Sequence, residues 1–172
     1  MKILKFKKQS KDKYKLYLDN NSDITLYEDV IIKNNLLITK EISDELLEAL
    51  KKQNNDMYAY TLALGYISVK MRSIKEINDY LIKKGFNNLV ANKVSERLIK
   101  EGYLNDLKYA KSFINDSMNL TNKGPQKIKM ELIKYGVNKD IIESEIALID
   151  QRKVEEKLNK LIDKELKIKK GS

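Results

Sequence analysis

The chain contains an internal repeat, because residues 57–100 align with residues 108–151 at a fixed offset of 51. At this offset Gly85 falls on Gly136, and apolar positions stay apolar. Such conservation of pattern marks a duplicated supersecondary unit, and units of this kind stack into an array. We therefore predict a mainly α fold of tandem three-helix repeats in an elongated array, preceded by a small N-terminal segment that contains a β-hairpin.

The pattern divides the chain into four parts. We expect the hairpin and two short helices in residues 1–56, the first repeat in 57–104, the second in 105–151, and the first helix of an incomplete third repeat in 152–172. The polar run Gln53–Asp56 is predicted to be a linker. Because an array needs a terminal unit that closes its core, we expect the sequence to be a fragment, with a true capping helix at the end as the alternative.

Alternating apolar residues in Tyr14–Leu18 and Ile24–Tyr27 predict two strands, with Ile3–Phe6 as a possible third. The residues between the first two, Asp19–Ser22, tolerate a left-handed backbone and favour a tight turn. Two helices should follow. They are expected at about residues 28–34 and 44–52, the second with Ser43 as its N-cap.

Helix signals mark three helices in each repeat. Ser73 and Glu76 form a capping box, and Gly85 occupies the position after the helix that they begin. In the second repeat, Pro125 suits a first helical position. The predicted helices of the first repeat cover about residues 57–69, 74–84 and 88–101. In the second repeat, Asn105 or Asp106 is expected to cap the first helix, and the other two are expected to start at Pro125 and at Asn138. A last helix is expected over about 153–167.

Composition excludes several kinds of chemistry. The sequence has neither His nor Cys, so it lacks a Ser-His-Asp triad, a Cys nucleophile, a disulfide and a thiolate metal site. It has no Gly-rich phosphate loop. No apolar run approaches the roughly 20 residues that cross a bilayer. We predict a cytoplasmic protein that is not an enzyme and uses no cofactor or metal.

The net charge of +9 is unevenly distributed along the sequence. Residues 1–56 carry 11 Lys against 10 acids, which leaves 23 Lys or Arg against 15 acids in the rest. This bias favours attraction to nucleic acid, to an acidic protein or to a nucleoprotein assembly. An ordinary solvated lysine surface is the alternative, since the basic residues are spread over many helices.

Several motifs together resemble the bacterial RecX family, whose members modulate the RecA recombinase. They are Tyr58-Ala59, Met71-Arg72-Ser73-x-x-Glu76-Ile77-x-x-Tyr80-Leu81, Lys84-Gly85, Val94-x-x-x-Leu98, Gly102-Tyr103-Leu104-Asn105-Asp106-x-x-Tyr109-Ala110-x-x-Phe113, Lys123-Gly124-Pro125-x-x-Ile128-x-x-Glu131-Leu132 and Gly136. The resemblance covers residues 57 to about 150, and residues 1–56 match less well. It implies a monomer that binds RecA filaments on DNA and lowers ATP turnover, filament growth and strand exchange.

On this resemblance, exposed basic residues are the candidates for partner binding. We single out Arg72, Lys75, Lys123 and Lys127 at helix starts, and Arg97, Lys111 and Lys134 behind them. The alternative for each is a solvated charge without a partner. Ser73, Glu76 and Gly85 are expected to be structural.

Two other functions fit the same sequence. A three-helix unit with a basic bias resembles helix-turn-helix architecture, so the chain could bind DNA directly, although no helix carries a concentrated Arg/Lys row. Tyr60, Tyr66, Tyr80 and Tyr103 could stack on bases, with the edges of the core as the alternative. A helical scaffold for another acidic protein is the third possibility.

Overall fold

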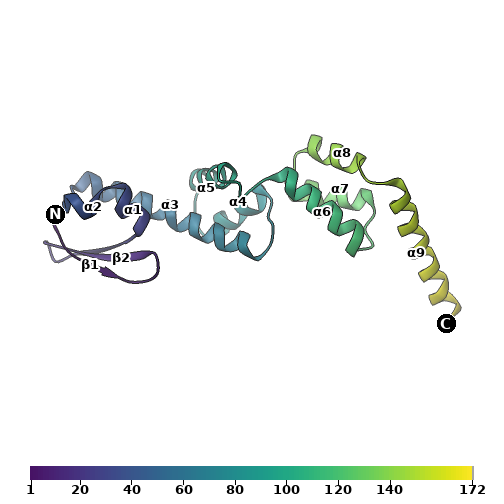
Figure 1. Cartoon of the computed structure of the whole chain (residues 1–172), viewed down its shortest axis with the longest axis horizontal. Helices are drawn as coiled ribbons and strands as arrows, with labels where there is room; N and C mark the ends of the chain where they lie inside the picture. Colours follow the sequence, from purple (N-terminus) through teal and green to yellow (C-terminus); the bar gives the residue numbers. More distant parts are fainter. Residues whose placement is uncertain (172) are drawn as a thin grey trace. The chain divides into compact units, whose positions relative to one another are not determined.

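The computed structural model describes residues 1–171, which divide into two compact units, one ending at Gly65 and the other starting at Tyr66. The described residues form three strands and nine helices (Figure 1). This confirms the predicted fold class of tandem three-helix units after a small sheet. The boundaries at 56/57, 104/105 and 151/152 stay predictions.

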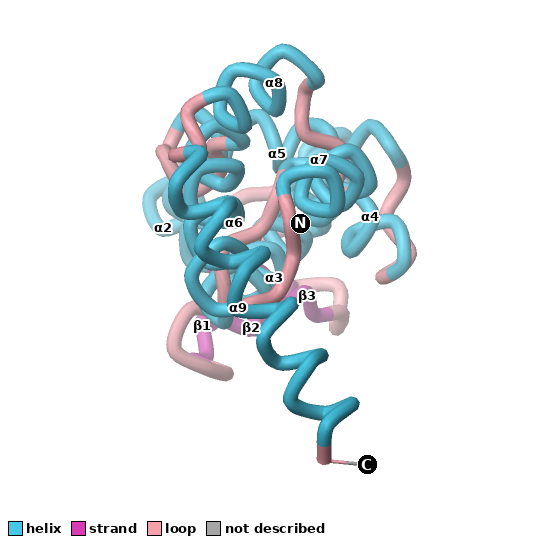
Figure 2. The backbone as a smooth tube through the Cα atoms, turned by 90° about the vertical axis from the view of Figure 1, so that its right-hand side faces the viewer, coloured by secondary structure: helices cyan, strands magenta, loops and turns pink. Residues whose placement is uncertain are grey.

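The first unit is a sheet packed on helices. Strands β1 (Ile3–Lys8), β2 (Lys13–Leu18) and β3 (Asp23–Tyr27) are antiparallel in the order β1-β2-β3, and Figure 2 shows them side by side. The two predicted strands and the possible third are therefore confirmed. Asn21 takes a left-handed φ of 64° in the β2–β3 turn, as its sequence indicated.

Three helices pack against the sheet. They are α1 (Glu28–Lys33), α2 (Leu36–Thr39) and the start of α3 (Asp44–Val69). Their shared core includes residues from the sheet and from each of these helices. Those with no exposed surface are Leu16, Leu26, Leu36 and Leu50. The Leu46 amide donates to Ser43 Oγ at 3.1 Å, which confirms the predicted cap of α3.

The predicted linker Gln53–Asp56 is wrong, because α3 runs through it without a break. Asn54 Oδ1 accepts from the Tyr27 amide at 2.8 Å, and its Nδ2 donates to the Thr25 carbonyl at 3.2 Å. Gln53 Oε1 likewise accepts from Asn34 Nδ2 at 2.8 Å. The polar run thus satisfies the open edge of β3 and the end of α1, and these tertiary contacts outweigh weak helix propensity.

The second unit holds two sets of helices with matching caps. After the end of α3 come α4 (Ile74–Lys83) and α5 (Asn88–Lys100), and then α6 (Asp106–Leu120), α7 (Pro125–Lys134) and α8 (Lys139–Ala147). Asn87, Asn105 and Asn138 accept hydrogen bonds from the first turns that they precede. The capping box at Ser73 and the proline at the start of α7 are confirmed.

Buried apolar side chains hold each set together. Ile77 and Leu81 of α4 pack with the buried row Val90, Val94 and Leu98 of α5. The core of α6, α7 and α8 is built on the buried residues Tyr109, Ala110, Ile114, Ile128, Leu132, Val137 and Ile142.

Helix α9 (Gln151–Lys170) follows, and Figure 1 shows it extending from α8. Lys157 Nζ donates to the Ser117 carbonyl at 2.9 Å and to the Lys123 carbonyl, and burial lowers the Lys157 pKa. The apolar residues Leu158, Ile162 and Leu166 stay 56%, 48% and 51% exposed. No helix among residues 1–171 is long and apolar enough to cross a membrane.

Candidate functional site

The start of α4 is where the two repeats meet. Ser73 Oγ accepts from the Glu76 amide at 3.2 Å, and Glu76 Oε2 accepts from the Ser73 amide at 2.8 Å. Two further hydrogen bonds join the start of α4 to the second repeat. Asp106 Oδ1 accepts from the Ile74 amide at 3.0 Å, and Ser73 Oγ donates to the Tyr135 carbonyl at 2.7 Å. Each repeat therefore satisfies polar groups that the other buries.

Gly136 brings the α7–α8 turn directly onto this junction. Its φ is +77°, and a Cβ added there would lie 2.6 Å from Lys75 Cβ. At Gly85 the φ is +100°, yet an added Cβ would meet nothing within 4 Å. Both glycines end a helix in the left-handed conformation. Only Gly136 is also required by close approach of the other repeat.

Two titratable groups lie in the junction, the half-buried Asp106 and the buried Tyr109. Burial raises the pKa of the Asp106 carboxyl, the bond from the Ile74 amide opposes that shift, and the charge of Glu76 adds to it. Burial also raises the pKa of the Tyr109 hydroxyl, which makes a hydrogen bond with Glu76. Tyr109 thus stays protonated and joins the second repeat to the capping box of the first.

A raised pKa in the folded state means that ionised Asp106 lowers stability at pH values above its unfolded pKa, and that this loss disappears as the pH falls through the folded pKa. Asp106→Asn keeps the oxygen acceptor without the charge, so we expect it to be at least as stable as the parent at pH 7. Asp106→Ala removes the acceptor of the Ile74 amide at the start of α4, and this loss should lower the free energy of unfolding by about 1 kcal/mol. Urea unfolding at pH 7 checks both, and an Asn variant as weak as the Ala variant would contradict this account.

An aromatic and basic stack adjoins the junction. The Tyr66 and Tyr80 rings are stacked, with centroids 4.1 Å apart and planes 6° from parallel. Arg72 Cζ lies 3.7 Å from the Tyr66 centroid, and Lys84 Nζ lies 5.6 Å from that of Tyr80. Cations over ring faces are attracted by the aromatic quadrupole. These rings are engaged within the molecule, which agrees with the core-edge alternative for the two tyrosines.

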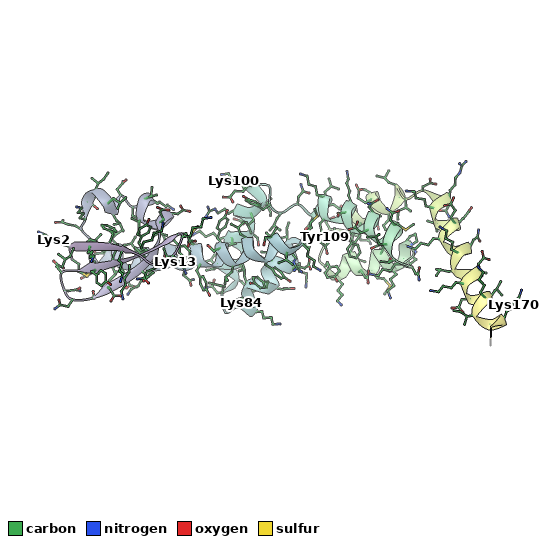
Figure 3. All side chains as sticks on the ribbon, turned by 60° about the horizontal axis from the view of Figure 1, so that its bottom comes forward. Lys2, Lys13, Lys84, Lys100, Tyr109 and Lys170 are labelled. Carbon is green, nitrogen blue, oxygen red and sulfur yellow. The ribbon has the colours of Figure 1, made fainter. Side chains whose placement is uncertain are left out.

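A groove of about 630 Å³ opens beside this stack. Its lining residues are Tyr66, Lys75, Glu76, Asp79, Tyr80, Lys83, Lys84, Lys134 and Tyr135. Four lysines face two acids, and one lysine is already paired, because Lys75 Nζ lies 2.7 Å from Asp79 Oδ2. Figure 3 shows Lys84 extending away from the ribbon. The groove is therefore net positive but carries charges of both signs.

Of the seven predicted binding residues, the structure brings only Lys75 and Lys134 into this groove. The prediction that Arg72 is exposed is wrong: its side chain is 11% exposed, and Nη1 lies 3.8 Å from Glu76 Oε1. That guanidinium is held between a tyrosine ring and the capping glutamate, so it stabilises the junction.

The other four lie elsewhere. Lys123 is half-buried, with Nζ 2.8 Å from a Glu131 oxygen, and Arg97 Nε lies 2.8 Å from Glu101 Oε1. Lys127 is exposed on α7, and Lys111 lines a smaller groove of about 230 Å³ with residues of α6, α8 and α9. The binding role of all seven stays a prediction.

The residues that sequence reasoning missed are Lys83, Lys84 and Tyr135. A possible signal was the Lys83-Lys84 pair just before the helix-ending Gly85, one turn beyond Tyr80. Among the described residues, no group of three or more possible ligand side chains could hold a metal ion.

Comparison with known proteins identifies the repeats. The models for the first and second three-helix domains of RecX match residues 59–98 and 105–144. The regulatory protein RecX of Streptococcus agalactiae serotype V is 35% identical over 173 residues, covering 98% of this chain and 67% of that protein. The chain belongs to the RecX family.

Other comparisons agree. The regulatory protein RecX of Streptococcus uberis is 40% identical over 157 residues. The matched region covers 91% of this chain but only 60% of that relative. The crystal structure of RecX from Lactobacillus salivarius superposes with a TM-score of 0.64 at 28% identity, over 70% of this chain and 78% of that one. A crystal structure of regulatory protein RecX matches in fold, with a TM-score of 0.86 at 24% identity, over 99% and 85% of the two chains.

Five residues of the RecX motifs lie at the junction. Ser73, Glu76, Asp106, Tyr109 and Gly136 all belong to the motifs that resemble the family, and each has a contact between the two repeats. These residues are therefore accounted for by the way the two repeats of this chain join, which leaves the lysines of the groove as the candidates for partner contact.

Proposed function

We propose that this chain binds RecA filaments on DNA in the cytoplasm and lowers their ATP turnover, growth and strand exchange. The observation that carries the proposal is membership of the RecX family, whose known role is modulation of RecA. The chain spans 60% of the length of the Streptococcus uberis relative, so the activity of that whole protein enters here as part of the proposal.

The groove at the repeat junction is the surface that we propose for contact with RecA. Its charges of both signs suit a protein partner, since Glu76 and Asp79 would repel a continuous phosphate backbone. The excess of lysine speeds encounter with an acidic nucleoprotein filament. Because the repeats are joined by partly buried hydrogen bonds, the groove is already formed before the partner arrives.

Direct helix-turn-helix DNA binding by the repeats is the weaker candidate. The two arginines of the repeats that could contact DNA already have partners within the chain. Arg72 lies over the Tyr66 ring and near Glu76, and Arg97 pairs with Glu101. Stacking of bases on the groove tyrosines is likewise opposed by the ring stack.

The test is DNA-dependent ATP turnover by the host RecA, titrated with this protein, beside a measurement of binding to the same DNA without RecA. We expect turnover to fall at protein concentrations well below those that coat the DNA. Unchanged turnover, or a fall that appears only when bare DNA is saturated, would overturn filament regulation and favour a DNA-binding module.

A further inference from the structure

Positive and negative charges are separated along the N-terminal segment, residues 1–56, although its net charge is close to zero. Residues 1–18, which form β1 and β2, contain seven lysines against the single acid Asp12, a net charge of +6. Residues 19–56 contain four lysines against nine acids, a net charge of −5. The positive charge of the first unit therefore lies in one β-hairpin.

Strand register places part of that charge on one face. Leu16 and Leu18 are buried, so their odd-numbered neighbours in β2 face away from the core. Lys7 is directly opposite Lys15, and Lys5 is opposite Tyr17. Like charges directly opposite each other destabilise an antiparallel pair. This arrangement is thus unfavourable for folding and suits a surface that awaits an anion.

Most of the charge on this face is not neutralised internally. Lys15 Nζ lies 3.2 Å from Asp23 Oδ2, the one carboxylate that shares the outer face by register. Lys5 and Lys7 are exposed, and no ion pair is formed by either among the described residues. Leu4, at the irregularity in β1, is 69% exposed beside them.

We propose that the outer face of the N-terminal sheet binds the backbone of single-stranded nucleic acid, with Lys5, Lys7 and Lys15 neutralising phosphates and Tyr17 stacking on a base. Lys5 and Lys7 are two positions apart on β1, a spacing of about 6.6 Å, and Lys15 lies opposite Lys7 on β2, so the three charges form a compact cluster that suits the backbone of a charged polymer. Tyr17 is half-buried, and Lys15 Nζ lies 5.5 Å from its ring centroid. A basic platform with an aromatic ring is the usual means of binding single strands without sequence preference.

This inference is independent of RecA regulation, because it concerns DNA alone. The experiment measures fluorescence anisotropy of a labelled oligothymidylate between about 50 and about 200 mM salt. Lys5→Gln/Lys7→Gln should weaken binding on the order of tenfold and reduce the slope of log affinity against log salt by about 1.4, or about 0.7 for each phosphate that is no longer neutralised. The matched control, Lys33→Gln/Lys52→Gln, removes the same charge from α1 and α3 and should leave the slope unchanged.

Tyr17 provides a second measurement that does not depend on net charge. Tyr17→Phe should bind as the parent does, whereas Tyr17→Leu should lose about fivefold or more in affinity. Circular dichroism verifies that each variant retains its fold. The proposal is overturned if the parent does not bind the oligonucleotide, if both lysine pairs reduce the slope equally, or if polyglutamate displaces the protein as effectively as DNA does.

Discussion

Gly136→Ala should destabilise the second unit by about 2–4 kcal/mol, combining a left-handed backbone cost with overpacking at the repeat junction. The new Cβ would lie 2.6 Å from Lys75 Cβ, an atom fixed to the backbone of α4 that no rotamer change can move. The junction would have to open, which would strain the hydrogen bond between Ser73 Oγ and the Tyr135 carbonyl. Urea unfolding followed by far-ultraviolet circular dichroism measures the loss.

Gly85→Ala is the matched control. Gly85 occupies the same position at the end of α4, also with a positive φ, but its surroundings are open. It should therefore cost only the backbone term of about 1–2 kcal/mol. Equal losses for the two variants would show that close approach at Gly136 contributes nothing and that the repeats are joined more loosely than their hydrogen bonds indicate.

Charge reversal in the groove should have the largest effect on function. We expect Lys83→Glu/Lys134→Glu to raise the concentration for half-inhibition of RecA ATP turnover by on the order of tenfold, because two exposed lysines, one from each repeat, become acids beside Glu76 and Asp79. The fold should be unaffected, since both side chains are at the surface. The measurement is the titration of ATP turnover at two salt concentrations, because an electrostatic effect weakens as salt rises.

Lys100→Glu/Lys108→Glu is the control for this pair. It also changes one exposed lysine in each repeat, but neither residue lines the groove. In Figure 3, Lys100 and Lys84 extend from opposite sides of the first repeat. If the control weakens inhibition as much as the groove variant, net charge rather than the groove governs the effect.

The helix ends could be predicted from sequence because their signals are local. Ser73 with Glu76, Pro125, and the glycines that end helices act within one turn of backbone, so the repeat and its caps were confirmed. Asp106 shows the limit of such reasoning. It looked like an alternative cap for its own helix, but Asn105 caps α6, and Asp106 accepts a bond from an amide 32 residues earlier.

Errors arose where a polar side chain has a distant partner. Gln53 and Asn54 are typical of a linker by composition, and only the folded chain places them against α1 and the edge of β3. Arg72 looked exposed at a helix start for a different reason: its partners Tyr66 and Glu76 are near in sequence, but they enclose it only because the end of α3 and the start of α4 meet there. The groove could not be predicted, since it combines side chains from α4 with others from the end of α7.

The junction also has a consequence for the order in which the chain can become structured during synthesis. Ser73 finds its acceptor at Tyr135, 62 residues further along, and the Ile74 amide finds its acceptor at Asp106. While the ribosome is still adding those residues, the first repeat has emerged with its central helix incompletely capped. The groove that we propose for RecA therefore forms only after the second repeat has been made, so that a nascent chain released early would lack it.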